Sequence, residues 1–155
     1  MHIETIREQF LRFWLTSDLQ AVIATESVGE VLSLDIVNIV PLPDIAYMVM
    51  GMYNHRGDIL WIMDLPCLLG LKPLHLSGSH HRCSILVMHF QQQTIGFAIP
   101  KVGQILSPQK YRMQLSFAKQ KTQQLDWCVQ GTCTSAEHTS MVILSSEKIF
   151  DLLKL

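Results

Sequence analysis

The sequence has almost no net charge and no concentration of basic residues. Its 12 Lys and Arg are balanced by 13 Asp and Glu, which gives a formal charge of −1 at pH 7. Nucleic-acid-binding domains gather Lys and Arg on one patch or stripe that neutralises phosphates, whereas the basic residues here are scattered along the chain. We therefore expect no nucleic-acid partner.

The sequence also has no long apolar run, and its first residues do not resemble a targeting signal. No segment approaches the roughly 18 uninterrupted apolar residues of a membrane-spanning helix. Residues 1–9 are polar and mixed in charge, without the basic start and apolar centre of a signal peptide. We therefore predict a cytoplasmic protein with no direct membrane insertion.

Cysteine is sparse and shows no disulfide pattern. The four cysteines are Cys67, Cys83, Cys128 and Cys133. They form no Cys-x-x-Cys pair, and three of them lie in or beside apolar runs. Disulfide frameworks belong mainly to small secreted chains. Free thiols that pack as small hydrophobic groups are expected instead.

Motifs of known catalytic chemistries are absent. The chain has no dinucleotide-binding glycine fingerprint, no Walker phosphate loop, no Gly-x-Ser-x-Gly and no His-Glu-x-x-His. Asp58 and Asp64 flank one apolar segment, but Asp58 has the position of a turn residue and Asp64 that of a helix cap. We predict that the protein is not an enzyme and has no cofactor.

A cluster of histidines leaves one alternative open. His80, His81, Cys83 and His89 lie close together in the sequence. Zinc sites need ligands in matched, closely spaced pairs on a rigid frame, whereas the side chains of two adjacent linker histidines diverge. No metal site is expected, although a small-molecule or metal-binding β module is the alternative function that these four residues would serve.

What the chain does contain is an internal repeat. The phrase Val-Gly-Glu-Val-Leu-Ser at Val28–Ser33 returns as Val-Gly-Gln-Ile-Leu-Ser at Val102–Ser107, 74 positions later. The same offset aligns residues 10–14 with 84–88 and residues 21–24 with 95–98. Self-similarity at a fixed spacing indicates a duplicated module.

Both copies follow the same plan: an apolar strand, a polar turn, a second apolar strand, and a Val-Gly bend into a third. With 48% hydrophobic residues, the chain has enough apolar side chains for a core. Short strands separated by frequent turns predict a sandwich or a barrel. The duplication favours two small antiparallel barrels, each closed to remove its exposed edges.

Short helices are expected at two places in the first copy. Asp44 is placed to cap one or two helical turns over Ile45–Met50 that end at Gly51. A second helix is predicted over Leu65–Leu69, between a cap at Asp64 and a left-handed stop at Gly70.

In the second copy, Pro108–Gln124 is the least apolar stretch and is predicted to be an exposed loop with at most a weak helix. Gly131 takes the place that Gly51 has in the first copy. A C-terminal helix over Glu147–Leu153 is expected, with Ser145 or Ser146 as its cap.

The segment 51–65 is more regular than a core requires. Asn54 can bond its own backbone and Gly57 permits a positive φ, so the two should fix a turn around Arg56. An arginine in a fixed turn can donate several directed hydrogen bonds. Its nearest acid is expected to be Glu30, beside the bend at Gly29.

Four motifs together resemble the CheW family, the coupling proteins of bacterial chemosensory arrays. They are Val28-Gly29-Glu30-Val31, then Ile39-Val40-Pro41-Leu42-Pro43, then Gly51-x-x-Asn54-x-Arg56-Gly57-x-Ile59 with Asp64-Leu65 after it, and finally Leu69-Gly70-Leu71. The resemblance covers the chain from about Phe10 to Leu153.

This resemblance implies a single all-β domain over residues 1–155 with short helices. Two interlocked, five-stranded SH3-like β-barrels would span about 10–72 and 82–145, followed by a C-terminal helix over 146–154. It also implies a function without catalysis. Such a protein bridges the cytoplasmic tip of methyl-accepting chemoreceptors to the histidine kinase CheA, docks on the CheW-like regulatory domain of CheA, and is associated with membrane receptor arrays through these partners.

The resemblance also implies a set of partner-binding positions around an apolar groove between the barrels, where the helical receptor tip would lie. These positions are Val28, Glu30, Gly51, Asn54, Arg56, Gly57, Gly96 and Val102. For Val28, Gly51, Gly96 and Val102, ordinary core packing or bend geometry is the alternative explanation. Substitution of Arg56 by Ala, or of Gly51 by Asp, is expected to leave the fold intact and to lower coupling to the kinase.

One position departs from the family pattern. Where the family commonly has a proline early in the strand after the Asn-x-Arg-Gly turn, this chain has Trp61. In this it resembles CheW-like proteins of cyanobacterial motility and phototaxis systems. A specialised CheW-like protein that occupies the kinase without a receptor is a further alternative.

Overall fold

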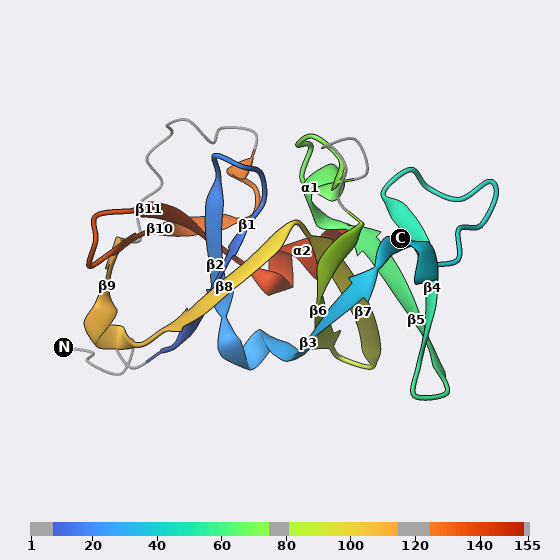
Figure 1. The fold of residues 1–155 in the computed structure, drawn as a ribbon. Helices are drawn as coiled ribbons and strands as arrows, with labels where there is room; N and C mark the ends of the chain where they lie inside the picture. The colour runs from blue at the N-terminus through green and yellow to red at the C-terminus, as the bar shows by residue number, and fades with distance from the viewer. Residues whose placement is uncertain (1–7, 75–80, 115–124, 154–155) are drawn as a thin grey trace. The chain divides into compact units, whose positions relative to one another are not determined.

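A computed structural model describes residues 8–74, 81–114 and 125–153 of the chain. Within these ranges strands are the main element, and two α-helices accompany them (Figure 1). The chain divides into two compact units. The first combines Met1–Ser27 with Val102–Leu155, and the second is Val28–Lys101.

The first unit is built on a six-stranded sheet with the strand order β8-β1-β2-β11-β10-β9. Its strands are β1 (Phe10–Trp14), β2 (Gln20–Ala24), β8 (Lys101–Leu106), β9 (Tyr111–Gln114), β10 (Val129–Ser135) and β11 (Ser140–Leu144), and helix α2 (Ser146–Leu153) follows them. One face buries a cluster formed by Phe10, Val22, Leu106, Cys133, Met141 and Ile143.

The second unit is built on a five-stranded sheet with the order β3-β6-β7-β5-β4. Its strands are β3 (Val28–Asp35), β4 (Val49–His55), β5 (Asp58–Asp64), β6 (Arg82–Phe90) and β7 (Gln93–Ile99), and helix α1 (Leu65–Leu68) follows β5. Its core cluster comprises Leu34, Ile39, Leu60, Ile62, Leu74, Cys83, Ile85, Val87 and Ala98.

The predicted all-β fold with short helices is confirmed, and each sheet takes strands from both copies of the repeat. The hairpin β1–β2 of the first copy has β8 and β11 of the second copy as its neighbours, and the hairpin β6–β7 of the second copy has β3 and β5 of the first. Each Val-Gly bend therefore carries the third strand of its copy to the hairpin of the other copy. The two compact units divide the chain at Val28 and at Val102, whereas the resemblance implied subdomains over about 10–72 and 82–145.

Two further details differ from the sequence-based expectation. The pairs β2–β11 and β5–β7 are parallel, so the sheets are not purely antiparallel. Part of the expected loop Pro108–Gln124 is strand β9, which gives the first unit a sixth strand. Residues 115–124 of that expected loop lie outside the described residues.

Glycines mark three irregularities in the ladders. The register shifts at Val28/Glu30, at Val49/Gly51 and at Val129/Gly131, as expected where an extra residue forms a β-bulge. The predicted equivalence of Gly51 and Gly131 is confirmed by the matching shifts in β4 and β10.

The expected helix over Ile45–Met50 is wrong. Asp44 has φ 58, a left-handed conformation, whereas an N-cap residue is extended. The chain instead enters strand β4, in which Met52 forms an isolated β-bridge with Val40. The N–H of Val40 donates to the carbonyl of Met52 at 2.8 Å, and the N–H of Met52 donates to the carbonyl of Val40 at 2.9 Å. This bridge brings the Val40 carbonyl against Gly51, which has φ 148 and whose added Cβ would lie 2.1 Å from that oxygen.

The predicted ends of the helices at Asp64, Gly70 and Ser145 are confirmed. An oxygen of Asp64 accepts from the N–H of Cys67 at 3.0 Å and Gly70 has φ 82 just after the helix. For α2, the Ser145 hydroxyl accepts from the N–H of Lys148 at 3.2 Å. Within the described ranges, no helix is long and apolar enough to span a bilayer.

All four cysteines are free thiols, as the sequence indicated. Cys83, Cys128 and Cys133 are buried. Desolvation raises the pKa of Cys83 and Cys133 to about 11 and that of Cys128 to about 12. These thiols therefore stay protonated and unreactive near neutral pH.

Candidate partner-binding site

The conspicuous pattern around Arg56 forms the tip of the β4–β5 hairpin in the second unit. His55 pairs with Asp58, which leaves Arg56 and Gly57 as a two-residue turn with φ 54 and φ 87. Positive φ at both positions is typical of a type I′ turn, the form that matches the twist of paired strands. The side chain of Asn54 accepts from the N–H of Gly57 at 3.0 Å and closes the turn.

Glu30 reaches this tip because of the bulge in β3. The shift at Gly29 places Glu30 opposite Val87, and a Cβ on Gly29 would lie 2.7 Å from Nε2 of His89. From there Oε2 of Glu30 accepts from Nη2 of Arg56 at 3.4 Å. The predicted contact between Glu30 and Arg56 is confirmed.

A third member of this cluster, His55, was not predicted from the sequence. Nε2 of His55 lies 3.2 Å from Oε1 of Glu30, and the ring of His55 is stacked on that of Tyr53 with centroids 6.3 Å apart. His55 and Tyr53 are two positions apart on β4 and so share one face of the strand. The two-residue spacing of Tyr53 and His55 was the sequence feature that could have indicated that they lie side by side.

Solvent exposure limits what the ion pair contributes to stability. The side chain of Arg56 is 75% exposed, while that of Glu30 is 33% exposed. Exposed pairs contribute about 0–1 kcal/mol, so the guanidinium is not needed to hold the fold. Its free donors remain available to a partner.

The outer face of the same hairpin carries large apolar side chains. Along β5, Leu60 and Ile62 are buried, whereas Ile59 is 66% and Trp61 is 38% exposed. The register places Ile59 opposite Asn54 on β4. Exposed apolar side chains that adjoin on a sheet are typical of a surface that binds another protein. Ile59 and Trp61 lie on the face of the hairpin opposite to that of Tyr53 and His55, and Arg56 lies at its tip. We call Glu30, Arg56, Ile59 and Trp61 together the hairpin surface.

Two of the predicted partner-binding residues lie in the interior of the second unit. Gly96 is buried in β7, where an added Cβ would lie 2.8 Å from both Ile62 and Ile85. Gly51 is also buried, against the backbone of Val40. The structure therefore supports the packing explanation for these two glycines. The expectation that Gly51→Asp leaves the fold intact conflicts with this close approach.

Val28 and Val102 are partly buried and belong to different units. The groove that these two residues were expected to line stays a prediction.

The alternative metal site finds no support in the described part of the chain, where no group of three or more His, Cys, Asp or Glu is placed to hold a metal. Nδ1 of His89 is 2.8 Å from the hydroxyl of Thr94, and Cys83 is buried. His80 lies outside the described residues.

Exposed apolar side chains on a hairpin are typical of a surface that binds another protein. Comparison with known families identifies the scaffold: the profile of the CheW-like domain matches residues 9–154, and the chain belongs to this family. The family is one of non-enzymatic scaffolding domains of chemotaxis signalling.

Among solved structures, the fold is similar to that of the scaffolding protein TtCheW from Thermoanaerobacter tengcongensis. The two share 16% sequence identity and superimpose with a TM-score of 0.71, over 94% of this chain and 93% of that one. A comparison with curated protein sequences found no match.

Proposed function

We propose that this protein is an adaptor that couples methyl-accepting chemoreceptors to a CheA-type histidine kinase in a chemotaxis or phototaxis pathway. The observation that carries the proposal is the hairpin surface in a chain of the CheW-like family. It combines an exposed guanidinium at the tip, fixed by a type I′ turn and by Glu30, with exposed apolar side chains on the outer face of the same hairpin. Coupling of this kind transmits geometry and needs no catalytic group.

We assign the hairpin surface to the kinase. A helical receptor tip needs a groove that receives one side of the helix, whereas Ile59 and Trp61 stand on an open strand face. The CheW-like regulatory domain of CheA would offer a β surface to such a face. The receptor would then bind at the predicted groove that includes Val28 and Val102. With these partners the protein would be cytoplasmic and held at membrane receptor arrays.

The test is binding of purified CheA to the Ile59→Ser and Arg56→Ala variants. Removal of an exposed side chain changes stability by only about 0.5 kcal/mol or less, so both variants should melt like the parent protein. We expect the affinity for the kinase to fall at least tenfold in Ile59→Ser and severalfold in Arg56→Ala. Lys72→Ala, an exposed residue of the same unit outside the hairpin, is the matched control.

Kinase activity with receptor present separates adaptor from antagonist. An adaptor raises receptor-dependent phosphorylation by CheA, and the hairpin variants lose this effect. A specialised CheW-like protein that occupies the kinase without a receptor would bind CheA and lower that activity. Undiminished kinase binding by folded Ile59→Ser and Arg56→Ala would refute the assignment of the hairpin surface.

A further inference from the structure

A second candidate surface lies in the first unit, at the edge strand β9. In the described sheet, β9 has β10 as its single neighbour and ends the strand order. The register sets Arg112 opposite Thr134 and Tyr111 opposite Ser135. Within residues 8–74, 81–114 and 125–153, no strand pairs with the outer edge of β9.

The hydrogen-bond pattern identifies which backbone groups point outward. The N–H of Ala136 donates to the carbonyl of Lys110 at 3.1 Å, just before β9 begins. Because antiparallel neighbours alternate between bonded and non-bonded pairs, Arg112 and Gln114 bond to β10. The N–H and C=O groups of Tyr111 and Met113 then face away from the sheet.

The two faces of β9 differ in character. The side chains of Tyr111 and Met113 pack against the core cluster of this unit. Those of Arg112 and Gln114 are exposed. A strand added to this edge would place alternate side chains beside Arg112 on the outer face.

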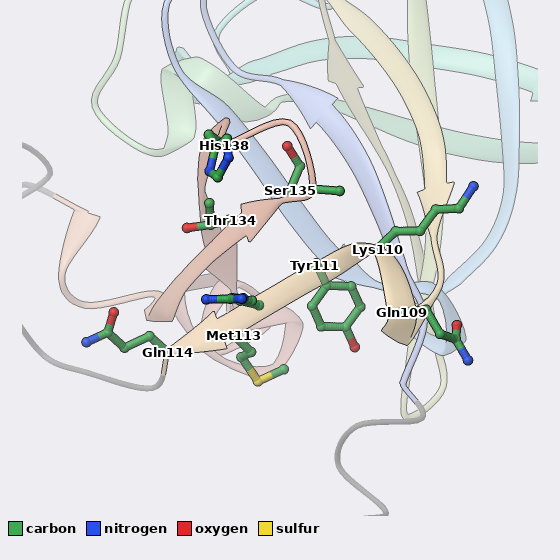
Figure 2. A pocket seen from close by; sticks show the side chains of 10 residues that line it. Gln109, Lys110, Tyr111, Met113, Gln114, Thr134, Ser135 and His138 are labelled. Carbon is green, nitrogen blue, oxygen red and sulfur yellow. The ribbon is translucent and has the colours of Figure 1, made fainter.

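A hollow of about 740 Å³ runs along this strand (Figure 2). Residues 109–114 line one part of it, and residues of the β10–β11 hairpin, His138 among them, line the other. None of the ten lining residues is an Asp or a Glu, whereas Lys110 and Arg112 each contribute a positive charge. The hollow therefore favours a ligand with negative charges.

The two cations have no ion-pair partner in the described part of the chain, where the salt bridges found are those of Glu30. Charged side chains on an edge strand also prevent pairing between identical copies. Two β9 strands placed side by side would bring Lys110 and Arg112 of both copies together. The same charges attract a strand of opposite charge.

We propose that β9 binds an extended acidic peptide segment of another protein by strand addition. The backbone groups of Tyr111 and Met113 form the new ladder, and acidic side chains at alternate positions of the peptide meet Arg112 and Lys110. This surface is separate from the hairpin surface and does not depend on the proposed role in kinase coupling.

Hydrogen exchange of the full chain with a synthetic probe tests this inference. The probe is an acetylated and amidated peptide with the sequence Thr-Glu-Val-Glu-Val-Glu-Thr. At saturating peptide, exchange of the Tyr111 and Met113 amides should slow at least tenfold. The amides of Arg112 and Gln114, already bonded to β10, should change by less than twofold.

Two matched comparisons sharpen the test. Arg112→Glu should weaken binding of the peptide at least tenfold, and Lys72→Glu, the same charge change on the other unit, less than twofold. A peptide N-methylated at alternate positions cannot pair with the edge and should not bind, which checks strand addition without altering the protein.

Three results would overturn the proposal: equal binding of the N-methylated peptide, binding of the probe without protection of Tyr111 and Met113, or protection of these amides by raised protein concentration alone. The last would identify a second copy as the occupant.

Discussion

At the scale of single residues, three glycines of the second unit show why similar sequence signals lead to different roles. Gly57 and Gly70 have positive φ, and an added Cβ on either would meet nothing within 4 Å. Gly51 also has positive φ, but its missing Cβ makes room for the carbonyl of Val40. In the sequence motif the three glycines look equivalent. The structure distinguishes them, because another backbone segment approaches Gly51 and none approaches Gly57 or Gly70 within 4 Å of the added Cβ.

We predict that Gly51→Ala lowers the free energy of unfolding by at least about 3 kcal/mol, because unfavourable φ and a collision with fixed backbone add together. The matched control is Gly57→Ala, which has the strained φ without the collision and should lose about 1 kcal/mol. Urea denaturation of both variants gives the two values. Equal losses would contradict the role assigned to the Val40 contact.

The residue scale also shows the limit of site prediction from sequence. The contact between Glu30 and Arg56 could be anticipated, since one acid lies beside a bend and one arginine sits in a fixed turn. The contribution of His55 depends on which strand face meets the bulge in β3. That relation is set by the register between strands distant in sequence, which the local pattern does not contain.

At the scale of elements, the sequence predicted best where a local side chain decides the conformation. The caps of α1 and α2 follow from Asp64 and Ser145, and the hairpin turn follows from Asn54 and Gly57. Predictions from the sequence failed where pairing with a strand distant in the sequence determines the local conformation. Tyr111–Gln114 becomes β9 because β10 supplies its partners, and Val49 and Met50 of the expected helix become strand because β5 pairs with β4.

The connection after β5 depends on one buried carboxylate. Asp64 is 1% exposed, and its oxygens accept from the N–H groups of Cys67 and Leu74 at 3.0 and 2.8 Å. It thereby caps α1 and fixes the chain ten residues further on.

We predict that Asp64→Ala costs about 2–4 kcal/mol, since two N–H groups lose their acceptor and at least one of them is buried. Asp64→Asn keeps one acceptor oxygen and should lose less. Asp58→Ala, an exposed acid at the other end of β5, should change stability by less than about 0.5 kcal/mol. Thermal unfolding of the three variants measures the order, and a loss in Asp58→Ala as large as that in Asp64→Ala would contradict it.

At the scale of the whole molecule, the dominant feature is the exchange of strands between the two copies of the repeat. The sequence showed the duplication and, through its resemblance to the CheW family, that the barrels interlock. The sequence also placed a bend at each Val-Gly pair, but it did not show that the strand after each bend joins the hairpin of the other copy. The crossings fall at Val28 and near Val102, the first residues of the repeated phrase.

We predict that neither half of the repeat folds alone. A fragment of residues 1–80 lacks the hairpin β6–β7 that lies between β3 and β5, and a fragment of residues 81–155 lacks the hairpin β1–β2 that lies between β8 and β11. Each should show no cooperative thermal transition by circular dichroism, whereas an equimolar mixture should regain one. A cooperative transition in either fragment by itself would show that the strand exchange is dispensable.

The strand exchange also has a consequence for how such a gene can change over time. A destabilising substitution in β3 weakens its pairing with β6, although the two strands belong to different copies of the repeat. Second-site suppressors should therefore arise across the repeat boundary more often than within a copy. Recombination that replaces one copy with that of a diverged relative would damage both barrels at once, so the two copies are bound to evolve as a single heritable unit.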